Sequence, residues 1–425
     1  MRKHRNSIRD WGRRLVIAAL LASALLLLRR TGYYDGIRSR LERSRSSRTE
    51  MSAGAENAMP RPIGAMIPLS LTVCAADNGG RFGTAYTGDG PSEVFQRFSL
   101  DLGEALGSAG APAPCTEEEF RACLNRCSVT MEFLCPMPLE LLSGWLGVEM
   151  SSAAAQHSAQ LLCLSAAEND TLLCYRAEDG AHYLCSTAVN TDGFRGRTAE
   201  YAPNGAIYAW ESDRLSDGGT LLLTELPQPA VINSALPSIR DREIDAMLTA
   251  VGMNSFVTNS YAESDGTVVY ISDENTMRID AGGQVFFRRA GTPDTRGDVD
   301  LTAAVGRAME IAELCMAPYA GDGALRFAGA AVFPEQRSCT VMLDYTVDGI
   351  PVRLASGHAA EIVVRGETVV QAQLQLRRFT RTPGRTELLP SLQAAAIAAA
   401  AGGMPELIYA DAGEATECMW VIENG

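Results

Sequence analysis

Lysine is almost absent from this chain of 425 residues, because Lys3 is the only lysine among 37 basic side chains. The body of the chain therefore has no lysine that could form a Schiff base or act as a general base. Histidine is nearly as scarce, since only His157, His182 and His358 lie beyond the first few residues. Glu361 follows His358, but the second histidine of a zinc-protease motif is missing. We interpret each histidine as a structural residue.

The motifs that mark common catalytic and cofactor sites are missing as well. No two cysteines have the CxxC spacing of zinc and thiol-redox sites, and there is no GxSxG, Walker or Rossmann sequence. We therefore expect no catalytic residue, no metal site and no small-molecule cofactor. Binding to another protein is the function class that these absences favour.

Negative charge dominates the composition, but its distribution is uneven. The chain carries −14 in total, whereas residues 1–50 hold 13 Arg and Lys against 4 Asp and Glu, which leaves −23 on residues 51–425. An acidic body repels nucleic acid and anionic lipid at long range. We expect no nucleic-acid partner, and only the basic N-terminal segment has the charge to bind an anionic surface.

An apolar run extends from Leu15 to Leu28, with two arginines directly before it and two after it. Its 14 residues are fewer than the about 20 that span a bilayer, but flanking arginines can reach toward both interfaces. We predict a transmembrane signal anchor at residues 15–30, a basic cytoplasmic tail at residues 1–14 and a flexible linker at residues 31–66.

A cleaved signal peptide is the alternative to this anchor. Ala22-Ser23-Ala24 resembles a cleavage site, although it lies inside the apolar run and further leucines and arginines follow it. Basic residues on both sides of the run leave the membrane orientation open when charge alone is considered.

The rest of the chain predicts an α+β protein with two domains, each built from helices and an antiparallel meander. In the first domain, residues 67–235, Pro91 opens a helix with an apolar stripe, and Thr116 begins a capping box that Glu119 completes. Three strands follow, at residues 161–165, 171–176 and 182–187. Prolines after residue 226 indicate the boundary to the second domain, residues 236–425.

The second domain is organised around residues 338–379. A first strand has apolar residues at every second position: Cys339, Val341, Leu343, Tyr345 and Val347. Strands at residues 360–365 and 369–377 complete a meander with one apolar face, which helices at residues 301–315, capped by Asp300, and 388–401 can cover. Residues 238–289 repeat the order of helix and short strands, and this repetition predicts an internal duplication.

This region also carries a resemblance to a known family. Tyr345, Val347, Gly349, Pro351 and Val352 have the form Y-x-V-x-G-x-P-V, which resembles the extracytoplasmic domains of the YycH/YycI type over residues 236–425. Such proteins are single-pass membrane proteins of Gram-positive bacteria, built from helix-plus-sheet units related to the PepSY family. They modulate WalK, the sensor histidine kinase of the WalK/WalR two-component system.

The resemblance implies a non-enzymatic regulator in the cell membrane, with its body outside the cytoplasm. A membrane protein such as a histidine kinase is then the expected partner, and both a heterodimer and a homodimer stay open. Two other functions fit the same features. A PepSY-like peptidase inhibitor or cell-envelope binding domain shares the anchor and the fold, whereas an exported enzyme with an unrecognised site is supported only by the cysteines.

Eleven cysteines are an unusual content for a body of this size outside the cytoplasm. Cys163, Cys174 and Cys185 are spaced by eleven residues, one in each strand of the first meander. This spacing predicts a thiol cluster in which one pair can form a disulfide. Simple burial of the cysteines as small apolar side chains is the main alternative, and metal binding or catalysis is the third.

The strand at residues 369–377 predicts an interaction face. Its polar side chains are Gln371, Gln373, Gln375 and Arg377, and they alternate with the apolar Val370, Leu374 and Leu376. Without catalytic motifs, an effect on a partner must come from differential binding to two of its states. We expect that contact to use this polar face or an exposed edge of the meander, unless the glutamines only keep the sheet soluble.

Overall fold

The computed structural model describes residues 63–77, 79–86, 90–211, 221–255, 257–272, 275–291, 299–412 and 416–423. The predicted tail and anchor, and all but the end of the predicted linker, lie outside these residues. None of the helices in the described ranges is long and apolar enough to cross a membrane.

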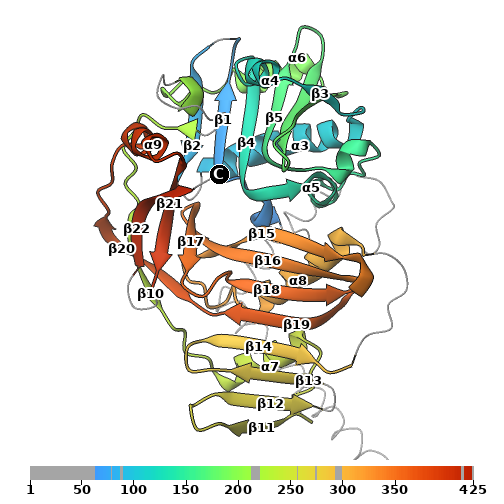
Figure 1. The fold of residues 1–425 in the computed structure, drawn as a ribbon, viewed down its shortest axis with the longest axis vertical. Coiled ribbons are helices and arrows are strands. Elements are labelled where there is room, and N and C mark those ends of the chain that lie inside the picture. Colours follow the sequence, from blue (N-terminus) through green and yellow to red (C-terminus); the bar gives the residue numbers. More distant parts are fainter. Residues whose placement is uncertain are drawn as a thin grey trace, which may run out of the picture. The chain divides into compact units, whose positions relative to one another are not determined.

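The first sheet has seven strands in the order β2-β1-β4-β5-β6-β7-β3, and all neighbouring strands are antiparallel (Figure 1). The strands are β1 (Ser70–Cys74), β2 (Arg81–Ala85), β3 (Ala113–Cys115), β4 (Ser128–Pro138), β5 (Ser158–Ala166), β6 (Thr171–Ala177) and β7 (His182–Ser186). The strands predicted at residues 161–187 are therefore β5, β6 and β7. A two-stranded piece, β8 (Ile207–Tyr208) with β9 (Leu221–Leu222), lies beside this sheet, as do the short 3-10 turns η2 (Ala153–Gln156) and η3 (Ala209–Glu211).

Helices cover both faces of the first sheet. Helices α3 (Gly90–Ser108), α5 (Leu139–Leu146) and α6 (Thr191–Thr198) share one core with it, and α4 (Glu117–Leu124) packs on the opposite face. The predicted capping box is present in α4, where Thr116 N–H donates to Glu119 Oε2 (2.8 Å) and Glu119 N–H to Thr116 Oγ1 (3.2 Å). Helix α6 is not evident from the sequence, because Phe194 and Thr198 are its only buried residues.

The second sheet has eleven strands, in the order β11-β12-β13-β14-β19-β18-β16-β17-β21-β22, with β15 also paired to β16. Only the pair β17–β21 is parallel among the described strands of this sheet. The strands are β11 (Asn259–Ala262), β12 (Val268–Ser272), β13 (Asn275–Ile279), β14 (Gln284–Arg289), β15 (Ala324–Phe333), β16 (Ser338–Val347), β17 (Ile350–Leu354), β18 (Ala360–Arg365), β19 (Thr368–Gln375), β21 (Met404–Asp411) and β22 (Thr416–Glu423). Strands β10 (Ala230–Ala235) and β20 (Arg378–Arg385) form a separate pair.

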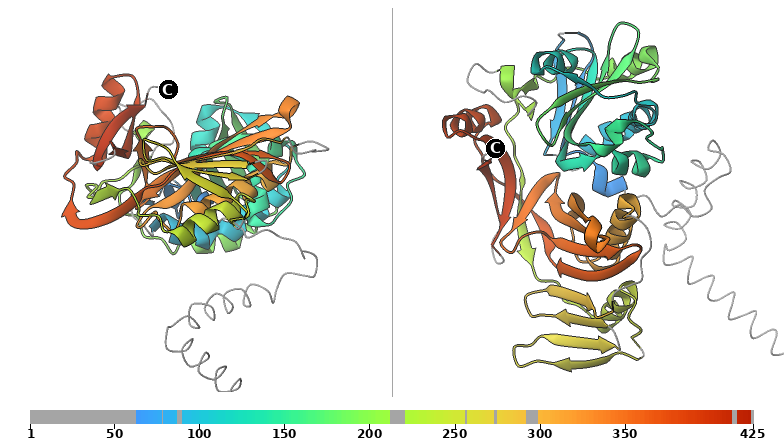
Figure 2. Two further views of the ribbon diagram at one scale, coloured as in Figure 1. Left: turned by 90° about the horizontal axis from the view of Figure 1, so that it is seen from below. Right: turned by 45° about the vertical axis from the view of Figure 1, so that its right-hand side comes forward.

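Helices α7 (Asp241–Ala250) and α8 (Leu301–Cys315) cover one face of this sheet, and the view from below in Figure 2 shows α7 on one side of the strands. Asp300 caps α8 as predicted, since its Oδ1 accepts from Ala303 N–H at 2.9 Å. Helix α9 (Ser391–Ala400) packs on β21 and starts after Pro390, three residues later than the sequence suggests.

The alternation predicted for β16 is confirmed. Cys339, Val341, Leu343 and Tyr345 are fully buried, and they face α8 together with the inward residues of β18 and β19. The register shift between Val363 and Val364 is a β-bulge that places Val369 opposite Val364. The expected burial of Val370 is therefore wrong, because Val369 takes that position and is 3% exposed.

The two helix-plus-strand units of the second predicted domain are joined by hydrogen bonds. Strand β14 of the first unit pairs with β19 of the second over five residues, from Gln284 opposite Gln375 to Arg288 opposite Gln371. The hydrophobic core is continuous from β1 and α3 through α8 to β22. The division into residues 67–235 and 236–425 stays a prediction, as does the internal duplication.

The end of the predicted linker is ordered as η1 (Ile63–Met66), which packs on β15. Arg326 of β15 is 9% exposed, and its guanidinium donates to the carbonyl oxygen of Gly64. Its Nε donates to Thr346 Oγ1 at 3.4 Å. Burial lowers the pKa of Arg326 to about 10, because the charged form loses its hydration.

Candidate interaction surface

Strand β19, which carries the predicted interaction residues, lies inside the second sheet and not at its edge. Gln371 is opposite Arg288 of β14 and Val363 of β18, and Gln373 is opposite Phe286 of β14. The edge expected for this meander is therefore covered by β14, which the sequence pattern did not place there.

Gln371 and Gln373 point away from the helices. Their neighbours Ala372 and Leu374 are each 1% exposed and belong to the core beneath α8, and successive side chains of a strand alternate between faces. In Figure 1 the face that carries the two glutamines is turned to the viewer, with α7 and α8 behind the strands. Within the described residues, no helix covers this face.

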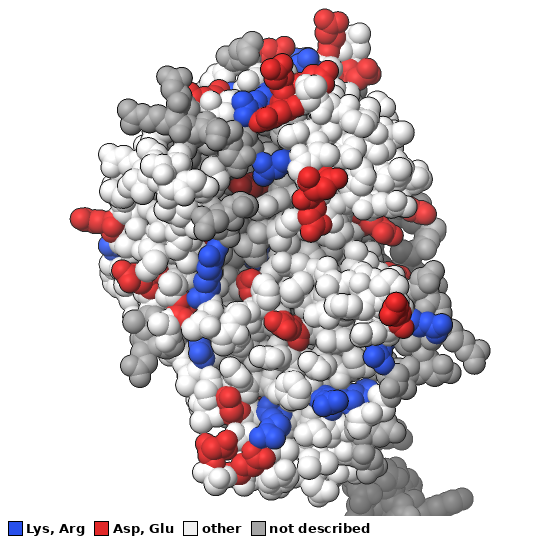
Figure 3. All heavy atoms as spheres, in the orientation of Figure 1, with Lys and Arg blue, Asp and Glu red and all other residues white. Residues whose placement is uncertain are grey.

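We call the outward side chains of β11–β14, β18 and β19 the outer sheet face. Its members include Tyr261, Ile271, Arg278, Phe286, Gln371 and Gln373. Tyr261 is 51% and Ile271 40% exposed, which is high for large apolar side chains. Figure 3 shows basic and acidic side chains scattered over the lower part of the molecule, where β11–β14 lie, with uncharged surface between them.

A shallow cavity of about 400 Å³ lies on the outer sheet face, with Arg278, Asp280, Phe286 and Gln373 among its lining residues. Arg278 forms an ion pair with Glu263 at 2.5 Å. The surface thus combines an aromatic ring, amide groups and a paired arginine. Aromatic residues and arginine are enriched in protein interfaces.

The outer sheet face ends at an open strand edge. Strand β11 pairs only with β12 among the described strands, and all four of its residues are exposed. Its sequence, Asn-Ser-Tyr-Ala, has neither a charge nor a proline, the two residue types that usually block addition of a further strand. This edge can therefore accept an extended segment of a partner by main-chain hydrogen bonds.

Gln375 is not part of this surface, which corrects the predicted interaction face. It is 2% exposed, and its Nε2 donates to the carbonyl oxygens of His358 (2.8 Å) and Ser356 (3.3 Å). The hydroxyl of Ser356 donates to its Oε1. The loop before β18 folds over the end of β19, so the amide of Gln375 serves to hold that loop.

Arg377 has a structural partner as well. Its Nε lies 3.4 Å from Oδ2 of Asp411, a carboxylate whose side chain is fully buried, and the arginine side chain is 17% exposed. Ser234 also donates to this carboxylate, at 2.7 Å. The ion pair links the end of β19 to β21, which leaves Gln371 and Gln373 as the predicted residues with outward side chains.

The predicted thiol cluster is divided by the sheet. Cys163 is directly opposite Cys174 across β5 and β6, whereas Cys185 is opposite Leu173 and lies in the core on the other face. Cys123 of α4 takes the place predicted for Cys185. The sequence spacing could not reveal this, because Cys123 reaches the pair by the packing of a helix. All eleven cysteines are free.

The histidines have ordinary structural partners. His157 Nδ1 lies 2.7 Å from the hydroxyl of Tyr175, and His358 Nδ1 lies 3.0 Å from Oδ2 of Asp344. His182 is opposite Cys115 across β7 and β3. Burial raises the pKa of the Cys115 thiol to about 11 and lowers the pKa of His182. The pair is therefore uncharged at neutral pH and lacks the thiolate of a nucleophilic cysteine.

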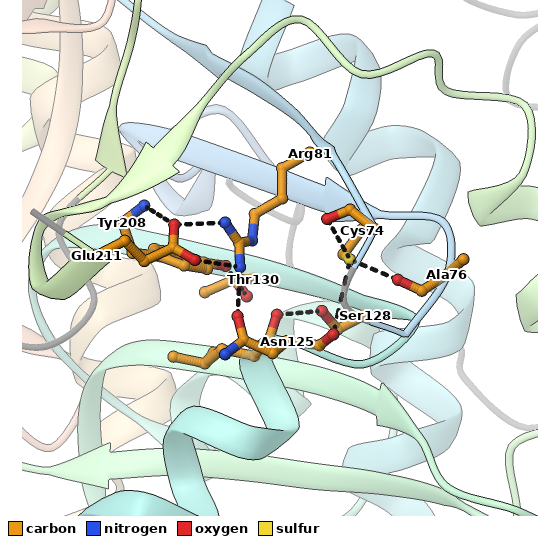
Figure 4. A network of polar contacts seen from close by, with 10 residues as sticks. Cys74, Ala76, Arg81, Asn125, Ser128, Thr130, Tyr208 and Glu211 are labelled. Atoms are coloured by element: carbon orange, nitrogen blue, oxygen red, sulfur yellow. Dashed lines mark hydrogen bonds and ion pairs between the residues drawn. The ribbon is translucent and has the colours of Figure 1, made fainter.

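A buried polar network fixes the end of α4 against β2 (Figure 4). Arg81 is 6% exposed, and its guanidinium forms a bidentate ion pair with Glu211, with N–O distances of 2.6 and 2.8 Å. The same group donates to Asn125 Oδ1 and lies 4.7 Å from the ring centre of Tyr208. The charged groups of this network are paired with one another, and Arg81 Nε is its one buried polar atom without a hydrogen-bond partner among the described residues. The network links Asn125 at the end of α4 to Glu211 of η3, so it positions these two elements.

Comparison with known proteins gives a match in structure but not in sequence. No protein-family model matches the chain, and no curated protein matches its sequence. Among solved structures, the crystal structure of YycH from Bacillus subtilis superposes with a TM-score of 0.53 over 88% of this chain and 97% of that one, at 9% identity.

The fold is YycH-like. The match covers nearly the whole of YycH, so it extends beyond the segment on which the sequence resemblance rests. A likeness at this identity concerns the fold alone, and the residues of YycH cannot be transferred to this chain. The finer assignment to YycI or to PepSY-like units stays a prediction.

Proposed function

We propose that the protein is a membrane-anchored regulator that binds and modulates a membrane partner, such as a sensor histidine kinase, and has no enzymatic activity of its own. The observation that carries this proposal is a YycH-like fold that leaves the outer sheet face and the β11 edge uncovered within the described residues. Regulators of the YycH/YycI type, which the sequence resembles, act on WalK.

The predicted anchor supports the same proposal. An anchor at residues 15–30 with the body outside the cytoplasm would confine regulator and partner to one bilayer, and confinement raises their effective concentration. A contact of moderate area is then sufficient for binding. The outer sheet face fits such a contact, since Tyr261, Ile271 and Phe286 supply apolar area and the glutamines supply hydrogen bonds.

Site-specific photo-crosslinking in native membranes tests this proposal. A crosslinking amino acid at Gln371 or Gln373 should capture one membrane protein, and a chain without residues 1–30 should lose that product. Leu100 on α3 is the matched control, because its side chain is 83% exposed but lies on a helix of the first sheet. Capture of a secreted peptidase would instead support the PepSY-like inhibitor.

Charge substitution provides a second readout. Tyr261→Asp should weaken the contact with the captured partner by roughly tenfold or more, as expected for an aromatic residue at an interface. Leu100→Asp should leave the affinity unchanged. Equal crosslinking from Leu100 and Gln373, or no effect of Tyr261→Asp, would contradict the assignment of the outer sheet face.

A further inference from the structure

Three cysteines meet in the small core beneath α4. Cys123 comes from α4, Cys163 from β5 and Cys174 from β6, and their exposed fractions are 2%, 0% and 0%. The thiol of Cys174 has hydrogen-bond contact with both of the others. Of the other fully buried cysteines near the first sheet, Cys127 and Cys185 lie in the separate core on the opposite face, whereas Cys74 of β1 belongs to neither core.

The backbone geometry around Cys174 permits a disulfide. Directly opposed residues of antiparallel strands have Cα atoms about 4.5 to 5.5 Å apart, and disulfides span about 4.4 to 6.8 Å. Cys163 and Cys174 are such a pair. Cys123 contacts the same sulfur from the helix side, so Cys174 has two possible disulfide partners but can bond to only one at a time.

We infer that Cys123, Cys163 and Cys174 form an oxidation site in which Cys174 is shared between two alternative disulfides, Cys123–Cys174 and Cys163–Cys174. The oxidant is a small hydroperoxide, which reaches the core when α4 opens locally. This site is independent of the regulatory function proposed above, because it requires only the geometry of the thiols.

The environment selects Cys123 as the first thiol to react. A hydrogen bond with the Cys174 thiol lowers the pKa of Cys123, and the positive charge of Arg126 acts in the same direction. The pKa of Cys174 is raised, since its hydrogen bonds to the neighbouring sulfurs and its burial favour the protonated form. Because the thiolate is the reactive species, Cys123 attacks the oxidant.

The chemistry balances in three steps. The Cys123 thiolate attacks one oxygen of hydrogen peroxide, the O–O bond breaks, and protonation releases one water and leaves a sulfenic acid. The Cys174 sulfur then attacks the Cys123 sulfur, and a second water leaves as the Cys123–Cys174 disulfide forms. Overall, two thiols lose two electrons and two protons to one peroxide, which becomes two waters. Cys163 can next attack Cys174 and displace Cys123 as a thiolate, without net oxidation.

The two disulfides have different structural consequences. Cys123–Cys174 fastens α4 to the sheet, whereas Cys163–Cys174 links two strands that are already paired and leaves the helix free of a covalent link. Helix α4 contributes Glu117 and Arg121 to a surface cavity of about 380 Å³ that Arg176 and His182 also line. The position of the disulfide thus determines whether one wall of this cavity is covalently held.

Disulfide mapping of the full-length protein tests the inference. Reduced, folded protein is treated with increasing hydrogen peroxide, free thiols are alkylated in denaturant, and disulfide-linked peptides are identified by mass spectrometry. We expect Cys174 to be joined to Cys163 or Cys123 at peroxide concentrations at least about tenfold below those that oxidise Cys185. This result requires no variant, so it does not depend on the folding of a mutant.

Variants then separate the two disulfides. In Cys163→Ser, the Cys123–Cys174 disulfide should accumulate, because no third thiol can displace it. In Cys123→Ser, the Cys163–Cys174 disulfide should form about tenfold more slowly than in the wild type, or slower still. Cys174→Ala should leave Cys123 as a sulfenic acid that dimedone traps. Cys185→Ser is the matched control, since Cys185 is 1% exposed on the next strand and should change none of these products.

Two outcomes would overturn the inference. One is a wild-type protein that stays folded by circular dichroism and forms no disulfide at Cys174 while other cysteines oxidise. The other is an equal loss of the Cys174 disulfide in Cys185→Ser, which would show that unfolding and not the arrangement of the three thiols controls the reaction.

Discussion

The burial of Gln375 can be tested by mutation. The alternation in the sequence places Gln375 on the same face of the strand as the exposed Gln371, whereas the structure buries it. Gln375→Glu keeps the size of the side chain but replaces an N–H donor with an oxygen. That oxygen would lie against the carbonyl of His358, which accepts from Nε2 at 2.8 Å in the wild type, and near the carbonyl of Ser356.

The cost follows from these contacts. Two donated hydrogen bonds are lost at about 1 kcal/mol each, and a carboxylate left facing buried carbonyls adds a further penalty, so we expect the free energy of unfolding to fall by about 3 kcal/mol at neutral pH. A protonated carboxyl group can donate one hydrogen bond again. The folded state therefore raises the pKa of the new group, and the penalty is smallest below its unfolded pKa and grows as the pH rises through the folded pKa.

Urea denaturation followed by tryptophan fluorescence measures this effect at about pH 4, below the unfolded pKa of a glutamate, and at about pH 8, above the expected folded pKa. Gln371→Glu is the matched control on the same strand, since Gln371 is exposed and opposite Arg288. It should change stability by less than about 0.5 kcal/mol at both pH values. Equal and pH-independent effects of the two substitutions would refute the placement of Gln375.

Two further predictions concern stability. Phe98→Ala should lower the free energy of unfolding by about 3 to 5 kcal/mol in the same denaturation assay, because this ring is fully buried against Phe194 and Tyr201. Leu100→Ala on the same helix is the control, since Leu100 is 83% exposed, and it should change the free energy of unfolding by less than about 0.5 kcal/mol. Arg326→Met should raise the free energy of unfolding by about 1 kcal/mol. The lowering of the arginine pKa to about 10 corresponds to a desolvation cost of about 3 kcal/mol, which is fully present below the folded pKa. This cost exceeds the about 2 kcal/mol that the two lost hydrogen bonds contribute. A loss of stability in Arg326→Met would show that the contact with Gly64 outweighs that cost.

The local patterns of this chain predict its elements well where burial on one side is complete. The apolar stripe of α3 and the alternation in β16 are both long enough to identify a buried face, and the Thr116–Glu119 capping box locates the start of α4. These features depend on contacts between residues close in sequence, or on a single face of one element. The order of strands within each meander follows from the same patterns.

Pairing over long sequence separations is what the local patterns cannot predict. Strand β20 contains Pro383 and several charged residues, and it is a strand only because β10 pairs with it. Nothing in β14 or β19 indicates that they are neighbours. The predicted interaction face and the predicted thiol cluster were partly wrong for a related reason. A loop buries Gln375, and the packing of a helix places Cys123 where Cys185 was expected. The alternation of residues along a strand contains no information on either contact.

The pairing of β10 with β20 has a consequence for how the chain folds. Strand β10 (residues 230–235) can form its hydrogen bonds only after residues 378–385 have been synthesised, and β17 can pair with β21 only after β21 has been synthesised. Closing such long loops is slow, because their entropy is lost before the new contacts compensate for it. During synthesis, the strands that emerge early therefore have unpaired edges until nearly the whole chain is available. A truncation before β20 should consequently yield a chain that aggregates, even though most of its helices and strands are present.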